Sequence, residues 1–291
     1  MKTKIAVALI ALSGWAGLST GFGSPPDTVT LRLRIPSGLK TEVTASGLLK
    51  LSVENRIQAY NQPESSLPDQ HTSSWKKKYT DVYALVEAGR PRRIVRHTES
   101  DTRTAKSPQS GKMETEDTPT KDSTVTLTLL PDGGVTLNED AEPQVADEFK
   151  LARMGTFVAD QELSTGTDWP IPEALLKACL PLVQSGSGTM KLTAVETDPT
   201  LKLRVAVIDG RLNLIYSIPI AEGAVLPIKF EGTLKLRVLI DSGLEILRKI
   251  DGQASLDFQV EQGVVKIHTI GKGEYHDIFS TKIKPSQLPG L

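Results

Sequence analysis

Residues 229–262, KFEGTLKLRVLIDSGLEILRKIDGQASLDFQVEQ, decide the fold that we expect for this chain. Apolar side chains recur there at every second position, as in Leu234, Leu236 and Val238. A period of two is typical of a β-strand with one buried face, whereas a helix needs a period of 3.6 residues. The segments 241–243 (DSG) and 251–252 (DG) predict turns between three antiparallel strands. We therefore expect these strands to form the core.

The composition indicates an ordinary globular chain. The 291 residues are 38% hydrophobic and 24% charged, which fits one large β domain or two smaller ones. The formal net charge of -1 argues against a partner bound by charge alone. The sequence therefore predicts no nucleic-acid partner and, at most, a peripheral association with a membrane.

The N-terminus, residues 1–23, has the pattern of a secretory signal peptide. Lys2 and Lys4 precede the apolar run 5–12, and 21–23 (GFG) offers a small-x-small cleavage site. An uncleaved anchor is the alternative, but the run is short for a hydrocarbon core of about 30 Å. We expect an exported protein, periplasmic or extracellular, that is soluble after cleavage.

The mature chain, residues 24–283, is predicted as a single mainly-β domain, with two β lobes (28–138 and 149–283) as an alternative and 284–291 as a frayed tail. Residues 99–123 contain no Leu, Ile, Val or aromatic residue. Because such a segment buries little apolar area, we expect a mobile polar loop.

Helical spacing is convincing only at 171–182, IPEALLKACLPL, where Pro172 suits the first turn and Pro181 the end. The single cysteine, Cys179, cannot form an internal disulfide, and we expect a small buried hydrophobe rather than a catalytic thiol. The unusually long run 228–240 predicts a bend at Gly232. We therefore expect a long, antiparallel, curved sheet, half-barrel-like, with one packed α-helix; a two-sheet β-sandwich is the alternative.

Further turns are expected at glycine-containing segments. These segments are 89–91 (GRP), 131–134 (PDGG), 209–210 (DG) and 271–273 (GKG). A hairpin at 271–273 would place His268 opposite His276, where two imidazoles could bind a transition metal weakly. Lys266 and Glu274 share that face, so we favour a solvated polar face instead.

Two charged clusters invite a ligand interpretation that we do not favour. The basic cluster could hold an anion, but a solvated face is the better interpretation. Its members are Lys76, Lys77, Lys78, Arg90, Arg92, Arg93 and Arg96. The acidic stretch 132–148 lacks the spacing of a calcium-binding loop, and we interpret it as a solvated turn. Trp169, in GTDWPIP, is expected to be a packing anchor rather than a sugar platform.

The order of these segments resembles that of exported, β-rich bacterial proteins of unknown function. The likeness rests on VYALVEAGRPRRIVR (82–96), on FVADQELSTGTDWPIP (157–172) and on turns such as 241–243. Those proteins look similar in organisation to curved-sheet carriers of lipids and lipoproteins in the bacterial envelope. The resemblance implies a lipid, an acyl chain or a segment of an envelope protein as partner.

Catalytic motifs are absent from the sequence. There is no nucleophile elbow, no Walker loop and no zinc-protease motif, so we nominate no catalytic residue, cofactor or metal ligand. Our first hypothesis is a non-enzymatic envelope protein that binds an apolar ligand in a groove between curved sheet and helix. A structural or protein-interaction module of the envelope is the alternative, and a hydrolase with an unrecognised site is the third.

Overall fold

The computed structural model describes residues 28–59, 62–106, 111–129, 135–137, 162–180, 183–221 and 224–288. The expected signal peptide, the turn at 131–134 and most of the acidic stretch 132–148 lie outside these residues, as does the side chain of Cys179. Within the described part, no helix is both long enough and apolar enough to cross a membrane.

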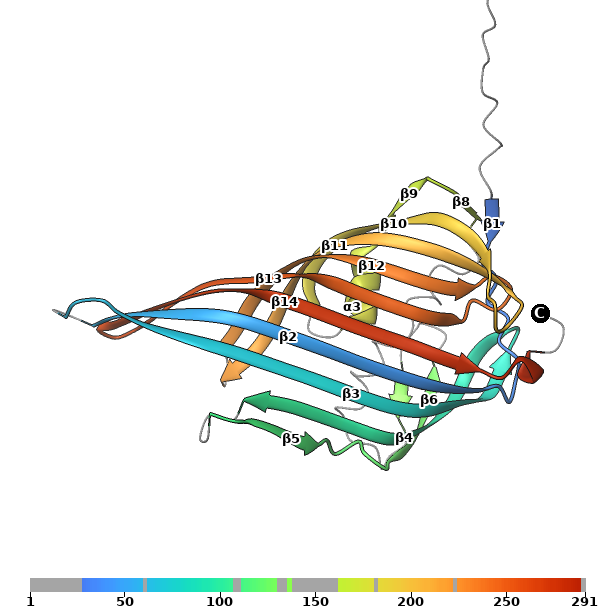
Figure 1. Cartoon of the computed structure of the whole chain (residues 1–291), viewed down its shortest axis with the longest axis horizontal. Helices are drawn as coiled ribbons and strands as arrows, with labels where there is room; N and C mark the ends of the chain where they lie inside the picture. Colours follow the sequence, from blue (N-terminus) through green and yellow to red (C-terminus); the bar gives the residue numbers. More distant parts are fainter. Residues whose placement is uncertain are drawn as a thin grey trace, which may run out of the picture.

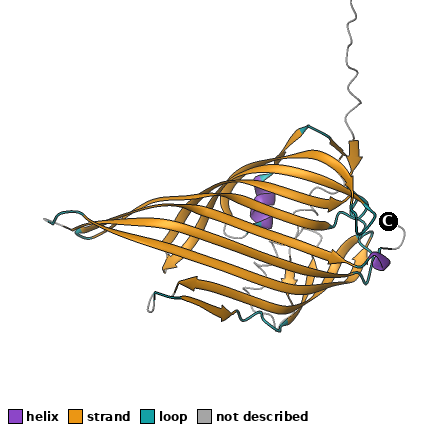
Figure 2. Cartoon of the chain, in the orientation of Figure 1, coloured by secondary structure: helices purple, strands orange, loops and turns teal. Residues whose placement is uncertain are grey.

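Strands make up most of the described chain (Figure 2). In chain order they are β1 (Thr28–Thr30), β2 (Lys40–Ala59), β3 (Ser65–Glu87), β4 (Arg90–Lys106), β5 (Met113–Asp117), β6 (Thr124–Leu129), β7 (Val135–Leu137), β8 (Glu162–Ser164), β9 (Asp168–Ile171), β10 (Val183–Thr197), β11 (Arg204–Ala221), β12 (Ala224–Leu239), β13 (Glu245–Gln262) and β14 (Val265–Ile283). A short helix, α3 (Glu173–Cys179), precedes β10, and a 3-10 turn (Pro285–Gln287) follows β14.

Twelve of the strands form one antiparallel sheet that is not closed into a barrel. Its order is β7-β6-β4-β3-β2-β14-β13-β12-β11-β10-β9, with β5 paired to β4, while β1 and β8 form a separate pair. The sheet bends around the side on which α3 lies (Figure 1). The expected long antiparallel sheet is confirmed, and the two-sheet sandwich is wrong because the large strands all share one layer.

The pairing of β2 with β14 joins the two ends of the chain. It runs from Ala59 opposite Val265 to Thr41 opposite Ile283. Strands from both segments that we considered as separate lobes therefore lie in one sheet. After β14 the tail continues to Leu288, which is buried in a core cluster, so the described part of the tail is packed.

The period-two pattern of the central stretch is confirmed. Leu234, Leu236 and Val238 are all almost fully buried, as are Ile250 and Ala254 on the neighbouring strand. The first and largest core cluster gathers such residues from β9 to β13 together with Leu31. A second cluster lies at the opposite side, around Leu39, Ile94 and Leu127.

The turns at Ala88–Gly89 and 241–243 are confirmed, but three expected turns are wrong. The segments 209–210, 251–252 and 271–273 lie inside the continuous strands β11, β13 and β14. Packing explains the glycines at 232 and 252, because the Phe230 ring lies over both and leaves no room for a Cβ. Glycine inside a strand often marks such a close approach rather than a turn.

Two further expectations need correction. The packed helix over 171–182 is not supported: α3 has only seven residues. The segment 99–123 is not a loop throughout, because β4 extends to Lys106 and β5 pairs with it. This segment buries few apolar residues, but main-chain hydrogen bonds and buried polar contacts order it. Its low apolar content therefore led to the wrong prediction of a loop.

Gly252→Ala should destabilise the fold. A Cβ at this position would lie 2.5 Å from the Glu231 carbonyl oxygen and from the Phe230 ring. We expect a loss of roughly 1–3 kcal/mol, measured by urea unfolding. Gln253→Ala, at the exposed neighbouring position, is the control and should have little effect. Equal unfolding midpoints for the two variants would contradict the role of the ring contact.

Candidate functional site

The two faces of the sheet differ sharply in chemistry. We call the face on which Leu212 and Leu234 lie the inner face; Leu176 belongs to the same core cluster. The opposite side is the outer face. Alternation along each strand assigns every residue to one face or the other, and the register extends that assignment across the sheet.

The inner face carries an apolar strip where β2, β14, β13 and β12 run side by side. Val53 stands opposite Gly271, which stands opposite Leu256, and Leu256 stands opposite Ile228. We define the strip by the members of the fourth apolar cluster on these strands, Leu51, Ile228 and Ala254 with the partly buried Leu49 and Val53; the partly buried Tyr216, on the neighbouring β11, borders it. The half-buried members are accessible from the inner side.

Further toward the core, the inner face holds a buried ion pair between β3 and β4. Arg96 donates to both carboxylate oxygens of Asp81, at 2.7 and 2.8 Å. Its guanidinium also lies 3.6 Å from the centre of the Tyr79 ring. Burial acts to lower the pKa of Arg96, and the Asp81 carboxylate outweighs it, so that this pKa is raised.

A second buried cation, Arg248, lies between two carboxylates. Its Nη2 is 3.5 Å from Oδ2 of Asp277, its Nη1 is 3.8 Å from Oε1 of Glu245, and its guanidinium lies 5.0 Å from the Phe279 ring centre. Burial raises the pKa of Asp277, although Arg248 acts in the opposite direction. Burial also raises the pKa of Tyr216.

A small cavity of about 30 Å³ lies beside these two groups. Asp81, Glu245, Tyr79 and Tyr83 are among the residues that line it. Such a space suits about one or two water molecules that would hydrogen-bond to the polar lining. This part of the inner face is therefore filled, and its charges serve the packing of the sheet.

The basic cluster expected from the sequence does not form an anion site. Lys77 lies 3.0 Å from Asp101, and Thr120 donates to the same carboxylate. Burial lowers the pKa of Lys77. Lys78 and Arg92 also pair with carboxylates, and Arg96 is only 3% exposed, so the solvated basic face that we favoured is wrong at Lys77 and Arg96.

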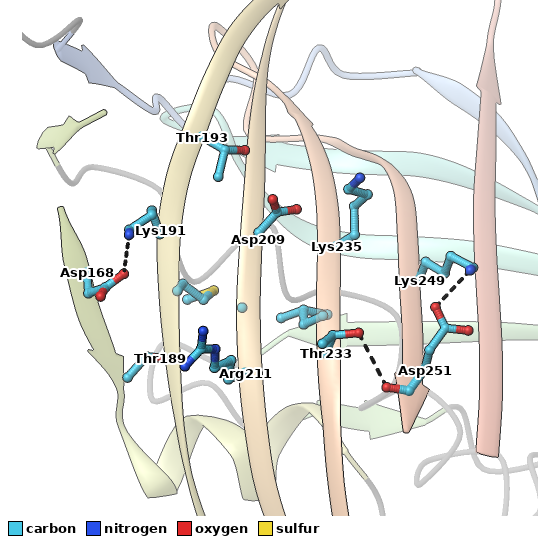
Figure 3. A pocket seen from close by; sticks show the side chains of 13 residues that line it. Asp168, Thr189, Lys191, Thr193, Asp209, Arg211, Thr233, Lys235, Lys249 and Asp251 are labelled. Carbon is cyan, nitrogen blue, oxygen red and sulfur yellow. Dashed lines mark hydrogen bonds and ion pairs between the residues drawn. The ribbon is translucent and has the colours of Figure 1, made fainter. Parts of the chain in front are cut away.

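On the outer face, a depression of about 530 Å³ opens over β9 to β13 (Figure 3). A row of charges crosses it: Asp168, Lys191, Asp209, Lys235 and Lys249 stand opposite one another in register on successive strands. Lys191 lies 3.4 Å from Asp168, and Lys249 lies 2.8 Å from Asp251. The charges alternate from Asp168 to Lys235, and such cross-strand pairs stabilise a solvated face; Lys249, opposite Lys235, pairs with Asp251 instead.

A second outer depression, of about 440 Å³, lies over β13, β14, β2 and β3. Lys50, Gln70, Lys272 and Glu274 are among its lining residues. Both outer depressions are polar and open, so neither offers an apolar compartment for a lipid.

His268 and His276 do not face each other, because the hairpin at 271–273 that would bring them together is a continuous part of β14. His268 and His276 lie on one strand, eight residues or about 26 Å apart. His268 Nε2 is 2.8 Å from Asp257, and His276 Nδ1 is 2.8 Å from Asp251. Among the described residues, no cluster of His, Cys, Asp or Glu could hold a metal ion. Trp169 packs against the first core cluster, as expected of an anchor.

Fold and faces together define an open, single-layer, antiparallel β-sheet protein with an apolar strip on its inner face. No family model matches the chain, and no curated protein matches it. Among solved structures, lipovitellin is 7% identical over 87% of this chain and 26% of its own, with a TM-score of 0.43. The chain therefore spans about a quarter of lipovitellin.

Two other solved structures show weaker likeness. DynF from the dynemicin biosynthesis pathway of Micromonospora chersina is 9% identical over 92% of this chain and 90% of its own, with a TM-score of 0.21. An outer membrane channel from Pseudomonas putida F1 is 10% identical over 89% and 98%, with a TM-score of 0.23. With all three TM-scores below 0.5, these likenesses do not define the function of this chain.

Asp81→Asn should destabilise the protein strongly. The substitution leaves the buried Arg96 guanidinium without its carboxylate, and breaking such a pair costs about 3–5 kcal/mol. Chemical denaturation measures the loss. Glu99→Gln is the matched control on the same two strands, because the Lys78–Glu99 pair is exposed and should matter little. If the control is as damaging as Asp81→Asn, burial is not the cause.

Asp277 should make stability depend on pH in an unusual direction. Its raised pKa means that the folded protein holds this proton more tightly than the unfolded chain does. The contribution of the protonated Asp277 to the free energy of unfolding is fully present below the ordinary pKa of 3.8. It is lost as the pH rises through the raised pKa of the folded protein.

Unfolding midpoints measured from pH 4 to pH 7 should therefore fall more steeply, or rise less, in the wild type than in Asp277→Asn. The asparagine cannot ionise, so the other carboxylates alone set its profile. Parallel profiles for the two proteins would show that Asp277 does not titrate differently on folding.

Proposed function

We propose that this chain is an exported, non-enzymatic protein of the cell envelope that binds an apolar ligand, a lipid or an acyl chain, on the apolar strip of its inner face. The observation that carries the proposal is that Val53, Leu49 and Tyr216 remain half-buried beside fully packed neighbours. Nearer α3, the inner face of the strands is covered by the first core cluster.

The dimensions of the strip suit one chain of a lipid. From Leu49 to Val53, β2 advances about 13 Å, and the four strands span about 15 Å in width. One leaflet of a bilayer is about 15 Å thick in its hydrocarbon part, which is half of the full core. A single acyl chain laid along β2 would therefore match the length of the strip.

The position of the ligand differs from our expectation of a groove between sheet and helix. Leu176 and Leu180 of the α3 region are buried in the first core cluster, so their contact with the sheet is already filled. The strip lies farther along the strands, on β2, β14, β13 and β12. We therefore place the ligand on an open apolar surface.

Polar chemistry on the rest of the sheet supports a binding protein over an enzyme. The buried charges Arg96, Asp81, Arg248 and Asp277 engage one another within packed surroundings. A hydrolytic site would need such groups to converge on a cleft that admits substrate. The outer depressions are open enough to admit a substrate. The charged side chains described there lie in rows across the strands and do not converge on one point.

Native mass spectrometry of the mature protein, purified without detergent from its own host, tests the proposal. We expect a co-purifying mass that extracts into organic solvent. Val53→Lys should abolish that mass, because it places a charge on the strip, whereas Ser52→Lys places the same charge on the outer face and should leave it. A wild-type protein without bound mass, which also takes up no added fatty acid, would refute lipid binding.

A further inference from the structure

The far end of four strands forms an amphipathic ribbon that projects beyond the rest of the sheet. β3, β2, β14 and β13 continue there as neighbouring hairpins, at the left of Figure 1. We define the ribbon end as the part from Leu67 on β3 and Phe258 on β13 to the turn at Gly263–Val264. It lies beyond the apolar strip and is separate from it.

The inner face of the ribbon end is apolar. Ile57, Ile267 and Val260 stand opposite one another on β2, β14 and β13, and all three are only half-buried. The next row contains Asn55 and Thr269, and the Thr269 hydroxyl donates to Oδ1 of Asn55 at 2.9 Å.

The two most exposed large apolar side chains of the described residues belong to this same end. Val264 is 69% exposed and Leu67 is 55% exposed. Single exposed apolar residues are normal on a soluble protein, but two of them at one end of the strands, beside an apolar sheet face, indicate an interaction surface.

The outer face of the ribbon end is charged, and its charges are paired within the ribbon. Arg56 lies 3.1 Å from Glu54, Lys266 lies 2.8 Å from Glu261, and His268 lies 2.8 Å from Asp257. Each described cation there has a carboxylate partner, so this end offers no basic patch to anionic lipids.

We propose that the ribbon end docks on a lipid bilayer through its apolar inner face, with Val264 and Leu67 entering the interface, and that neutral lipid headgroups suffice. An interfacial amphipathic helix buries its apolar face about 5–10 Å into a bilayer in the same manner. The ribbon is a β-sheet counterpart, since its main-chain groups are already paired along four strands.

The size of the surface favours a bilayer over a protein partner. Three inter-strand spacings of about 4.8 Å and five residues at about 3.3 Å give roughly 250 Å². A specific protein interface buries about 800 Å² on each partner. A bilayer imposes no such requirement, because it adapts to whatever apolar surface is presented.

Docking would place the apolar strip next to the membrane, from which the proposed ligand could be drawn. Membrane docking in this role rests on the proposed function, but ligand binding and docking are tested at different residues. Val53 reports on ligand binding, whereas Val264 and Leu67 report on docking.

Flotation of the mature protein with phosphatidylcholine vesicles tests the proposal. We expect wild type to float with the vesicles, and adding anionic lipid or salt should change the bound fraction less than twofold. The double variant Val264→Ser, Leu67→Ser should lower the vesicle affinity at least tenfold, because each side chain loses apolar burial. Both positions are exposed, so the variant should keep the wild-type unfolding midpoint.

The control removes two exposed apolar side chains elsewhere. Leu85 lies at the opposite end of β3 and Ile278 lies on the outer face, each 41% exposed. Leu85→Ser, Ile278→Ser should float as wild type does. Membrane docking would be overturned if the wild type did not float, or if both double variants lost vesicle binding equally. It would also be overturned if the wild type formed a dimer that only the Val264→Ser, Leu67→Ser variant breaks. Ligand found by mass spectrometry without flotation would leave the proposed function standing and refute docking alone.

Discussion

Main-chain pairing between β2 and β14 is the constraint on which the rest of this structure depends. It joins residues as far apart in the sequence as Asn55 and Thr269, which also bond through their side chains. Without this ladder, the sheet would split into two separate sheets, one ending at β2 and the other ending at β14. The loop-closure entropy that opposes such a pairing is offset only when the whole length of both strands pairs at once.

That long pairing also separates the molecule into two zones along the strands. Near one end, the inner face is packed by apolar clusters and by the buried Arg96–Asp81 and Arg248–Asp277 pairs. A buried charge is costly to leave unpaired, so these pairs must stay together for this zone to pack. Toward the other end, the same face carries half-buried apolar rows, and an ion pair there, Lys106 with Asp69, is exposed to solvent. For this reason the ligand and membrane contacts are proposed at that end.

Several features were predictable because they are local. The alternation around Leu234, the turn at 241–243 and the packing role of Trp169 follow from neighbouring residues. Glycine was misleading because it occurs both in turns and inside strands where another group packs closely against the backbone. At Gly252 only the contact with the Phe230 ring, seen in the tertiary structure, distinguishes the two cases. The apolar strip was not predicted as a site: its residues alternate as core residues do, and the sequence contains no signal for what remains uncovered.

By itself, the sequence determined that this chain is mainly β, with long strands and one apolar face, because a period of two is a property of adjacent residues. Only the tertiary structure decided which strands are neighbours, that Lys77 and Arg96 are buried beside carboxylates, and that His268 and His276 share one strand. Those facts depend on pairing between distant segments. The free energy of such pairing comes from the whole sheet, so no short stretch of sequence encodes it.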